Sequence, residues 1–293
     1  MDGMSVLIPT YNYCCVELVR ELHEQLILIG LDFEIIVADD GSTDKDTLQE
    51  NNAINLMTHC VFIPREQNIG RASIRNFLSQ QARYERLLYL DSDAKICRKD
   101  FVSTYLKYDS PIIDGGVTID YNDSMKHNLR YHYEFANKGN HTANRRQSRP
   151  YQHFRTTNFM IKRTIMIEHP FDERYRYYGY EDVAFGKVLH ENNIPILHID
   201  NPIWMEGLED NYHFIEKTEE GLRTLYEFHE ELQDYSRLLL TINSLPCPAI
   251  WLIRLWHRLF GTWERRQLTG NHPWLSLFNI YKIGYYLNYS KEE

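Results

Sequence analysis

The 293-residue sequence has few cysteines, and none are arranged as a disulfide framework or a zinc site would require. There are five, an odd number, and no two of them form a Cys-x-x-Cys pair. Structural zinc sites and secreted disulfide scaffolds both depend on paired cysteines, so this pattern argues against both. We therefore expect the protein in a reducing compartment, the cytoplasm.

Long apolar runs and several common nucleotide-site motifs are also missing. No stretch reaches the roughly 18 apolar residues of a membrane-spanning helix, and no signal peptide is expected at the start of the chain. The P-loop, dinucleotide-binding and hydrolase-elbow motifs do not occur. The formal charge of −9 argues against nucleic acid as the main ligand. Residues 236–293 differ, with seven Lys and Arg against three Glu, which predicts different surroundings for this segment.

What the sequence does contain is an alternation of short apolar runs with longer segments of helical spacing. Strands are predicted at 5–8, 33–38, 60–63, 87–90 and 157–162, and helices at 16–29, 70–83 and 181–192. A further apolar run at 194–199 is followed by one or two helices within 209–240. This order predicts an α/β fold with a mainly parallel central sheet flanked by helices, and ligands bound beyond the strands' carboxyl ends. Residues 120–150 lack periodicity and predict a mobile loop, a candidate lid.

Asp91-Ser92-Asp93 follows the predicted strand 87–90. If strand geometry continues, the side chains of Asp91 and Asp93 point the same way. Two adjacent carboxylates favour a divalent cation such as Mg²⁺ or Mn²⁺, which commonly shares a substrate phosphate. A solvated acidic turn is the competing interpretation, and the pattern alone does not decide between them.

Three other polar segments have both a structural and a functional interpretation. Residues 39–44 predict a turn with Ser42 or Thr43 capping the next helix, or a carboxylate that accepts the N3–H of a pyrimidine base. Arg71 and Arg75 near a helix start suit an anion, or form an exposed basic face. Residues 179–182 open a helix with acidic side chains that favour its dipole, or that supply a general base toward a sugar hydroxyl.

The order of these segments is more specific than any one of them. Val6–Asn12, Val37–Ser42, Asn68–Gly70 with Arg75-Asn76, Leu90–Asp93 and Tyr178–Asp182 follow one another along the chain. This series resembles the family 2 glycosyltransferases of the GT-A (Rossmann-like) fold over roughly residues 4–235. Residues 156–163 and 178–182 also look like the acceptor side of bacterial members that build cell-surface polysaccharides.

The resemblance implies a role for each matching residue. The donor-binding set would be Pro9, Tyr11, Asp40, Arg71, Arg75, Asp91 and Ser92. Within it, Asp40 would hold the base of a nucleotide diphosphate sugar, most often a UDP-sugar, with Pro9 and Tyr11 beside the ring. Asp91 would reach the ribose or sugar, and Arg71 or Arg75 would support the phosphates or the sugar-binding carboxylates.

The resemblance also implies a metal, a general base and acceptor contacts. Asp93, with Asp91, would bind Mn²⁺ or Mg²⁺ across the diphosphate. Asp182 would take the proton of the acceptor hydroxyl in a single inverting displacement, with Glu181 and Tyr180 contacting acceptor or donor sugar. Relatives often place a metal-binding His where this sequence has Met205, a poor ligand for a hard cation. His198, His213 and Glu206 are the candidate replacements.

These considerations predict a glycosyltransferase domain at 1–235, with a donor half up to 118 and an acceptor half from 119. Residues 236–293 form a helical, basic and aromatic extension. Its segment 246–289 predicts either an interfacial helix at the inner face of the cell membrane or a helix packed on the catalytic domain or a second subunit. The expected activity is sugar transfer to a glycan or a lipid-linked glycan. A non-catalytic sugar- or nucleotide-binding scaffold and a sugar nucleotidyltransferase are the alternatives.

Overall fold

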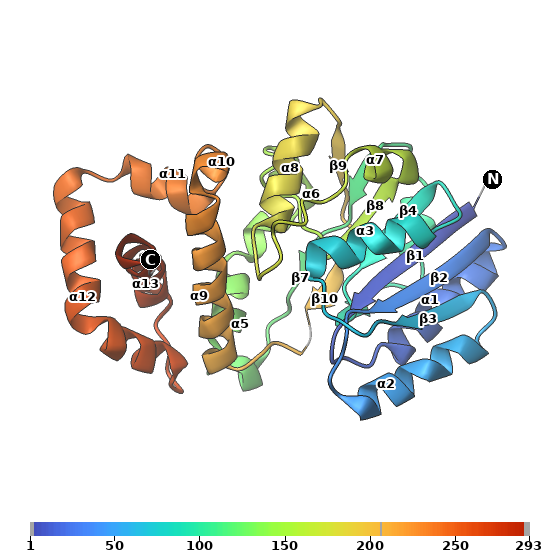
Figure 1. The fold of residues 1–293 in the computed structure, drawn as a ribbon, viewed down its shortest axis with the longest axis horizontal. Helices are drawn as coiled ribbons and strands as arrows, with labels where there is room; N and C mark the ends of the chain where they lie inside the picture. The colour runs from blue at the N-terminus through green and yellow to red at the C-terminus, as the bar shows by residue number, and fades with distance from the viewer. Residues whose placement is uncertain (1–2, 206, 290–293) are drawn as a thin grey trace. The chain divides into compact units, whose positions relative to one another are not determined.

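The computed structural model describes residues 3–205 and 207–289, which divide into two compact units (Figure 1). The first comprises Met1–Thr118, Gly139–Arg176 and Ala184–Gly207, and the second Ile119–Lys138, Tyr177–Val183 and Leu208–Glu293. One division falls after residue 118, residues 139–176 and 184–207 belong to the first unit, and residues on both sides of 235/236 belong to the second. The predicted donor half, acceptor half and C-terminal extension stay a prediction.

Seven strands form the central sheet of the first unit, in the order β3–β2–β1–β4–β8–β6–β9. Their bounds are β1 Gly3–Thr10, β2 Asp32–Asp39, β3 Cys60–Pro64, β4 Arg86–Leu90, β6 Ile112–Asp114, β8 Asn158–Lys162 and β9 Ile196–His198. All neighbours pair in parallel except β8, which is antiparallel to β4 and β6. A smaller sheet has the order β5–β10–β7, formed by Ala94–Ile96, Ile203–Met205 and Val117–Thr118. The predicted mainly parallel sheet is confirmed.

Helices cover both faces of the central sheet. In β1, Val6 and Ile8 pack with α1 on one face, and Leu7 packs with α3 on the other, as alternation along a strand requires. Burial on both faces explains why the strands are apolar throughout. The helices of this unit are α1 Val16–Ile29, α2 Lys45–Asn51, η1 Asn52–Leu56, α3 Arg71–Gln81, α4 Phe101–Tyr105, α6 Ala143–Gln147 and α7 Arg163–Glu168. α8 (Glu181–Glu191) and η3 (Lys138–Asn140) each cross a division between the units.

Two sequence-based predictions about loops are wrong. α2 is capped by Asp44, whose carboxylate accepts the N–H of Asp46 at 3.1 Å, and not by Ser42 or Thr43. The segment 120–150 is not an irregular loop. It contains α5 (Leu129–Ala136) in the second unit and α6 in the first, and both helices bury side chains.

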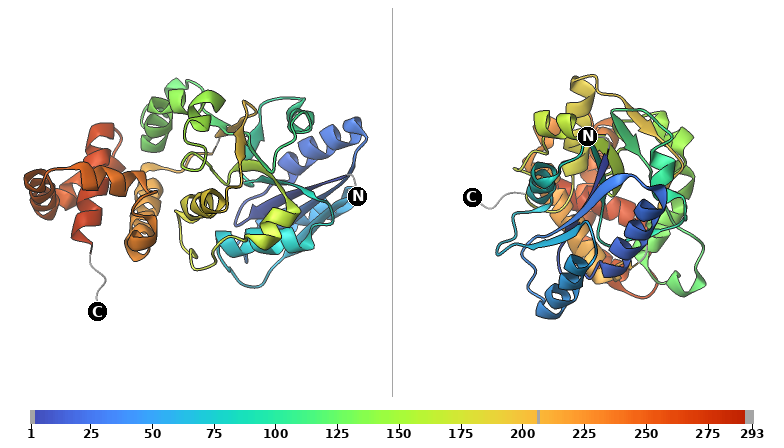
Figure 2. Two further views of the ribbon diagram at one scale, coloured as in Figure 1. Left: turned by 90° about the horizontal axis from the view of Figure 1, so that it is seen from above. Right: turned by 90° about the vertical axis from the view of Figure 1, so that its right-hand side faces the viewer.

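The second unit is helical. It contains η2 Asp123–Met125, α5, α9 Asn211–Glu227, α10 His229–Leu232, α11 Arg237–Ser244, α12 Cys247–Thr269 and α13 Leu275–Asn288. α12 and α13 lie side by side and both contact α9 (Figure 2). Their shared core contains Leu129, Ile215, Leu268, Leu277, Phe278 and Tyr281. Among residues 3–205 and 207–289, no single helix is long and apolar enough to cross a bilayer. α11 and α12 pass that test together, but their axes bend by 117° at the break.

Lys282 of α13 gives this unit a predictable pH dependence. Its Nζ lies 4.6 Å and 4.7 Å from the ring centres of Phe278 and Tyr133, and burial lowers the pKa of Lys282 to about 8. An unfolded lysine has a pKa of about 10.4, so between pH 8 and 10.4 the unfolded chain binds more protons. Stability should therefore rise as pH increases through this window.

We expect Lys282→Met to remove this rise. At pH 7 it should increase the free energy of unfolding by about 1–2 kcal/mol. The variant no longer buries a charge, and the free energy gained in this way exceeds the cation–π stabilisation that is lost with the two rings. Urea unfolding at pH 7 and at pH 9.5 measures both effects. Lys138→Met is the control, since Lys138 is exposed and lies 5.7 Å from the Phe135 ring centre. If the free energy of unfolding changed equally with pH in wild type and in Lys282→Met, the prediction would be contradicted.

Candidate functional site

Asn12 joins two loops at the carboxyl edge of the central sheet. β1 and β2 pair in parallel and end in register, so the loops after them begin side by side. Asn12, with a φ of 49°, donates its backbone N–H to Oγ of Ser42 at 2.7 Å. Its side-chain oxygen accepts the backbone N–H groups of Thr43 at 2.9 Å and Asp44 at 3.1 Å. The two loops therefore form one connected edge.

The two aspartates after β2 have different structural tasks. Asp39 accepts the N–H of Ser42 at 2.8 Å and closes its own turn. Asp40, which is 5% exposed, accepts the N–H groups of Ile69 at 2.9 Å and Gly70 at 3.0 Å from the loop after β3. Burial raises the pKa of Asp40, and these two N–H groups act in the opposite direction. The contact of Asp40 with a nucleotide base stays a prediction. Each carboxylate oxygen already accepts one N–H, so the base would bind to a second lone pair of one of them.

The close approach of these loops depends on glycine at two positions. Gly41 has a φ of 74°, and a Cβ there would lie 2.6 Å from the backbone nitrogen of Asn68. Gly70 has a φ of 90°, and a Cβ there would lie 2.7 Å from the carbonyl oxygen of Arg176. Any other residue would strain the backbone and push the loops apart. Gly41 thus lets the loop after β3 approach Asp40, and Gly70 lets that loop approach the backbone of Arg176.

Arg75 holds the aspartate that comes after β4. Its Nη2 donates to Oδ1 of Asp91 at 2.7 Å, and its Nη1 donates to the carbonyl oxygen of Arg71 at 3.1 Å. Arg75 is 3% exposed, whereas the side chain of Asp91 is 31% exposed. A buried cation therefore orients a carboxylate that still reaches solvent. Of the two roles predicted for Arg75, this geometry matches support of a carboxylate.

Asp91, Ser92 and Asp93 lie in a turn and not in a continued strand. β4 ends at Leu90, and the N–H of Ala94 donates to the carbonyl oxygen of Asp91 at 3.1 Å. The alternation that would point the two carboxylates the same way needs extended backbone, so that argument for a paired site is wrong. Asp93 is exposed and Ser92 is half-buried.

The remaining donor-side predictions lie at the same edge. Pro9 is partly buried near the end of β1, and Tyr11 lies just beyond that strand and is exposed. Arg71 is the first residue of α3 and is half-buried. β1, β2 and β4 run in parallel, so the loop residues Tyr11, Asp40 and Asp91 all come after strands that end at one side of the sheet.

Met205 lies beside the turn that contains Asp93. β10 pairs antiparallel with β5, and Met205 stands opposite Ala94 in that pairing. A side chain at position 205 is therefore close to the aspartate turn, as the resemblance implies for a metal-ligating His. Glu206, one candidate replacement, lies outside the described residues. His213, another, has its Nδ1 2.9 Å from the carboxylate of Asp210 within the second unit.

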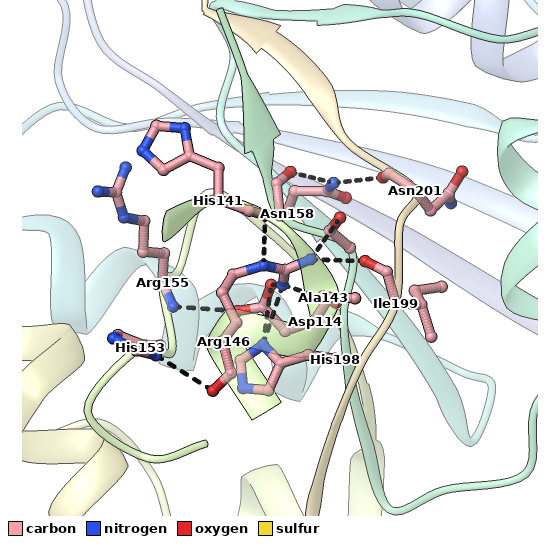
Figure 3. Close-up of polar contacts among 12 residues, drawn as sticks. Asp114, His141, Ala143, Arg146, His153, Arg155, Asn158, His198, Ile199 and Asn201 are labelled. Atoms are coloured by element: carbon pink, nitrogen blue, oxygen red, sulfur yellow. Dashed lines mark hydrogen bonds and ion pairs between the residues drawn. The ribbon is translucent and has the colours of Figure 1, made fainter. Parts of the chain in front are cut away.

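His198 belongs to a buried network and is not brought together with Asp91 and Asp93 as predicted. Its Nδ1 lies 2.9 Å from Nη1 of Arg146 (Figure 3). Its Nε2 lies 2.9 Å from the carbonyl oxygen of Pro150. Both ring nitrogens are therefore engaged. Within the part of the chain that the structure describes, no three His, Cys, Asp or Glu side chains gather as metal ligands.

Arg146, at the centre of this network, is a residue that the sequence did not single out (Figure 3). Its guanidinium pairs with Asp114 of β6 and is almost completely buried. It also donates to the carbonyl oxygens of Ile199 at 2.6 Å, His141 at 3.0 Å and Gly115 at 3.2 Å. Arg146 thus fixes α6 to the β6–β9 end of the sheet. Only its position in a segment rich in arginine and histidine hinted at an interaction, without showing its partner.

In the second unit, a strained turn precedes the predicted general base. Gly179 has a φ of 89° and Tyr180 a φ of 69°, which is unusual for a residue with a side chain. Burial of the Tyr180 side chain raises the pKa of its hydroxyl. The N–H of Tyr178 donates to the carboxylate of Glu220 on α9 at 3.1 Å. Its carbonyl oxygen accepts the hydroxyl of Thr224, also on α9, at 3.1 Å. These contacts fix the start of α8.

The three residues predicted at this helix start differ in exposure. Asp182 accepts the N–H of Val183 at 2.8 Å and is half-buried. Glu181 is 4% exposed, and Tyr180 is half-buried. The contacts predicted for Glu181 and Tyr180 with acceptor or donor sugar stay a prediction.

Residues 5–169, more than half of the chain, match the model of glycosyl transferase family 2. The chain belongs to this family. TuaG of Bacillus subtilis (strain 168), whose name provisionally assigns it to teichuronic acid biosynthesis as a glycosyltransferase, is 33% identical over 112 residues. The match covers 36% of this chain and 41% of TuaG, so it spans about two fifths of that relative.

Solved structures of TarS and of a mannosyltransferase share the fold of this family 2 chain. TarS of S. aureus (fragment 1-349) aligns over 97% of this chain and 89% of that one, with a TM-score of 0.53 and 20% identity. The mannosyltransferase PcManGT of Pyrobaculum calidifontis, solved with GDP-Man and Mn²⁺, aligns over 97% and 86%, with a TM-score of 0.53 and 16% identity. At these identities the likeness establishes the fold, and the predicted GT-A-like α/β architecture is confirmed.

Proposed function

We propose that this chain is an inverting glycosyltransferase that moves a sugar from a UDP-sugar to a glycan or lipid-linked glycan of the bacterial cell surface. The observation that carries the proposal is the sheet edge formed by Asn12, Asp40 and the Arg75–Asp91 pair. Beyond parallel strands, such an edge binds nucleotides. Support for the donor comes from TarS, solved with UDP and with UDP-GlcNAc, and support for the acceptor from the name of TuaG.

The proposed donor site uses carboxylates that the fold already orients. Asp40 accepts the base N–H, and Tyr11 lies against the base. Asp91, held by Arg75, accepts hydroxyl groups of the ribose or the transferred sugar. Pairing with a buried guanidinium fixes the rotamer of Asp91, which lowers the entropy lost on binding.

The residues at the aspartate turn fit a divalent cation that binds together with the nucleotide. Asp91 and Asp93 supply two carboxylates, of which Asp91 already pairs with Arg75 at 2.7 Å. Mg²⁺ commonly uses one or two carboxylates and completes its shell with substrate phosphates and water. Asp93, with Asp91, would therefore hold Mn²⁺ or Mg²⁺ only alongside a diphosphate. When bound, such an ion neutralises charge that develops on the leaving diphosphate.

Asp182 is the proposed general base, and its carboxylate accepts the proton of the acceptor hydroxyl. The hydroxyl oxygen then forms a bond to the anomeric carbon as the bond from that carbon to the diphosphate oxygen breaks. The nucleoside diphosphate leaves with the bonding electrons, and the anomeric configuration inverts. The fixed turn at residues 178–180 would hold the base at a constant orientation, which is the requirement for efficient proton transfer.

The donor proposal predicts a nucleotide- and metal-dependent rise in melting temperature. UDP with Mn²⁺ should raise it by several degrees, since a ligand at about 100 times its Kd stabilises the folded state by about 2.7 kcal/mol. Mn²⁺ without nucleotide should shift it by less than about one degree, because two carboxylates without a diphosphate hold the ion weakly. GDP, CDP and their Mn²⁺ complexes test the base. No shift with any nucleotide would contradict the donor site.

Met205 provides a sharper test of the metal site and of the non-catalytic alternative. Met205→His should increase Mn²⁺ affinity in the presence of UDP by about tenfold or more, since an imidazole replaces a thioether beside the aspartate turn. Met205→Leu keeps the packing without adding a ligand and serves as the control. If wild type binds UDP without metal and only Met205→His transfers sugar, the chain is a non-catalytic scaffold in its natural form.

A further inference from the structure

The outward face of α12 is apolar along most of its length. Seven large side chains on this helix are at least 37% exposed and together form its apolar face: Trp251, Leu252, Leu255, Trp256, Leu259, Phe260 and Trp263. They recur at helical spacing and therefore share one side of the helix. A core helix presents the reverse pattern, with polar side chains toward solvent. An exposed patch of this kind marks a surface for a partner or a membrane.

The opposite side of α12 packs inside the second unit, where Glu264 and Leu268 are fully buried. Glu264, which is fully buried, accepts Nε1–H of Trp256 at 2.7 Å and pairs with Nδ1 of His257 at 2.7 Å. His257 packs against α13 so closely that a Cβ at Gly284 would lie 2.6 Å from its own Cβ. The packed side of α12 thus contains Glu264, His257 and Leu268, and Trp256 joins the edge of the apolar face to Glu264.

Positive charge borders the apolar face. α12 contains Arg254, Arg258, Arg265 and Arg266, and its one acidic residue, Glu264, is buried. Arg254 donates to the carbonyl oxygen of Leu287 at 2.8 Å, and because this acceptor is uncharged the positive charge of Arg254 is not neutralised. Arg265 pairs with Glu219 at 2.9 Å, so its charge is balanced within the unit. The exposed Arg254, Arg258 and Arg266 therefore present positive charge beside the apolar face, on a chain whose formal charge is −9.

We propose that α12 lies in the surface of an anionic lipid bilayer, parallel to the membrane plane. Tryptophan, leucine and phenylalanine side chains would enter the headgroup and upper acyl region, and the arginines would bind lipid phosphates. A bilayer-spanning α11–α12 pair fits less well, since the pair bends by 117° and α12 alone contains four arginines. A second copy of the chain also fits less well, because a two-fold contact would bring the same arginine-bordered faces together.

The tryptophans give this proposal a direct spectroscopic test with the full chain. Of its five tryptophans, three lie on α12, and Trp274 immediately precedes α13. Adding vesicles of phosphatidylcholine with phosphatidylglycerol (3:1) should shift their emission to the blue, and brominated lipids should quench it. Vesicles of phosphatidylcholine alone should bind at least tenfold less, and 0.5 M NaCl should weaken binding to the anionic vesicles.

Matched variants distinguish membrane binding by the apolar face of α12 from binding by exposed apolar residues elsewhere on the protein. Trp251→Ser with Leu259→Ser should lower co-flotation with anionic vesicles at least tenfold. Leu28→Ser with Leu56→Ser should leave it unchanged, because these leucines are at least as exposed but lie in the first unit. Arg258→Gln with Arg266→Gln should lower binding and remove most of its salt dependence. Unchanged circular dichroism and melting temperature show that each variant is folded.

The outcomes are distinguishable from one another and from failure of the transferase proposal. Equal binding of wild type and the α12 variants to anionic vesicles, or no binding of either, overturns the proposal. A wild-type dimer in light scattering that Leu259→Ser converts to a monomer, without vesicle binding, assigns the face to a second copy instead. All of these measurements use protein without nucleotide or acceptor, so none of them depends on the proposed transfer reaction.

Discussion

The Asp182→Asn variant is expected to keep its nucleotide affinity and to lose turnover by about 10²–10⁴-fold. General-base catalysis contributes rate factors of this size, and an amide does not accept the proton of the acceptor hydroxyl. Asparagine still offers an oxygen to the N–H of Val183, a bond of 2.8 Å in the structure, so the start of α8 should be preserved. Initial rates of nucleoside diphosphate release at saturating donor and acceptor measure turnover, and the thermal shift with UDP measures donor binding.

Asp210→Asn is the matched control for this experiment. Asp210 also begins a helix in the second unit, where its carboxylate accepts the N–H of His213 at 2.9 Å. The chemical change is the same, and turnover should stay within about twofold of wild type, because surface substitutions of this kind have small effects. Turnover of Asp182→Asn at the wild-type rate would show that another group takes the proton. Equal loss in both variants would show that the effect is structural.

The first unit was predictable because its signals are local. Strands buried on both faces read as short apolar runs, and α1 repeats Leu18, Leu22 and Leu26 at helical spacing before ending at Gly30, which adopts the left-handed conformation that glycine favours. The motifs at the ends of β1, β2 and β4 reach one edge because the parallel topology leaves no other arrangement. Features set by periodicity and chain order could therefore be inferred from the sequence.

The features that failed depend on contacts between distant residues. The turn at Asp91 leads into β5, whose pairing partner β10 lies far along the chain, so nothing near Asp91 in sequence shows where the strand geometry stops. The outward direction of the apolar face of α12 depends on which side of that helix packs against α9 and α13. A helical wheel gives the angle between two sides of a helix, but not which side is buried.

Arg146→Ala is expected to destabilise the fold more than any other substitution proposed for this protein, by about 3–5 kcal/mol. It removes one partner of a buried ion pair and leaves the carboxylate of Asp114, which is 1% exposed, without its cation. The carbonyl oxygen of Ile199 loses the guanidinium donor as well, and that of Gly115 keeps only the N–H of Asn201. Urea unfolding monitored by circular dichroism measures the change, and the melting temperature should fall by roughly 10 °C.

Arg145→Ala is the matched control, because Arg145 is the neighbour of Arg146 in the same turn of α6. Arg145 is exposed, and Arg145→Ala should change the free energy of unfolding by less than about 0.5 kcal/mol. Adding Asp114→Asn to Arg146→Ala should recover part of the loss, because no unpaired charge is then buried, and the amide oxygen still accepts the N–H of Arg155. If Arg146→Ala were no less stable than Arg145→Ala, α6 would not be fixed to the sheet by this pair. If the double variant were the least stable of all, desolvation of Asp114 would not be the cause of the loss.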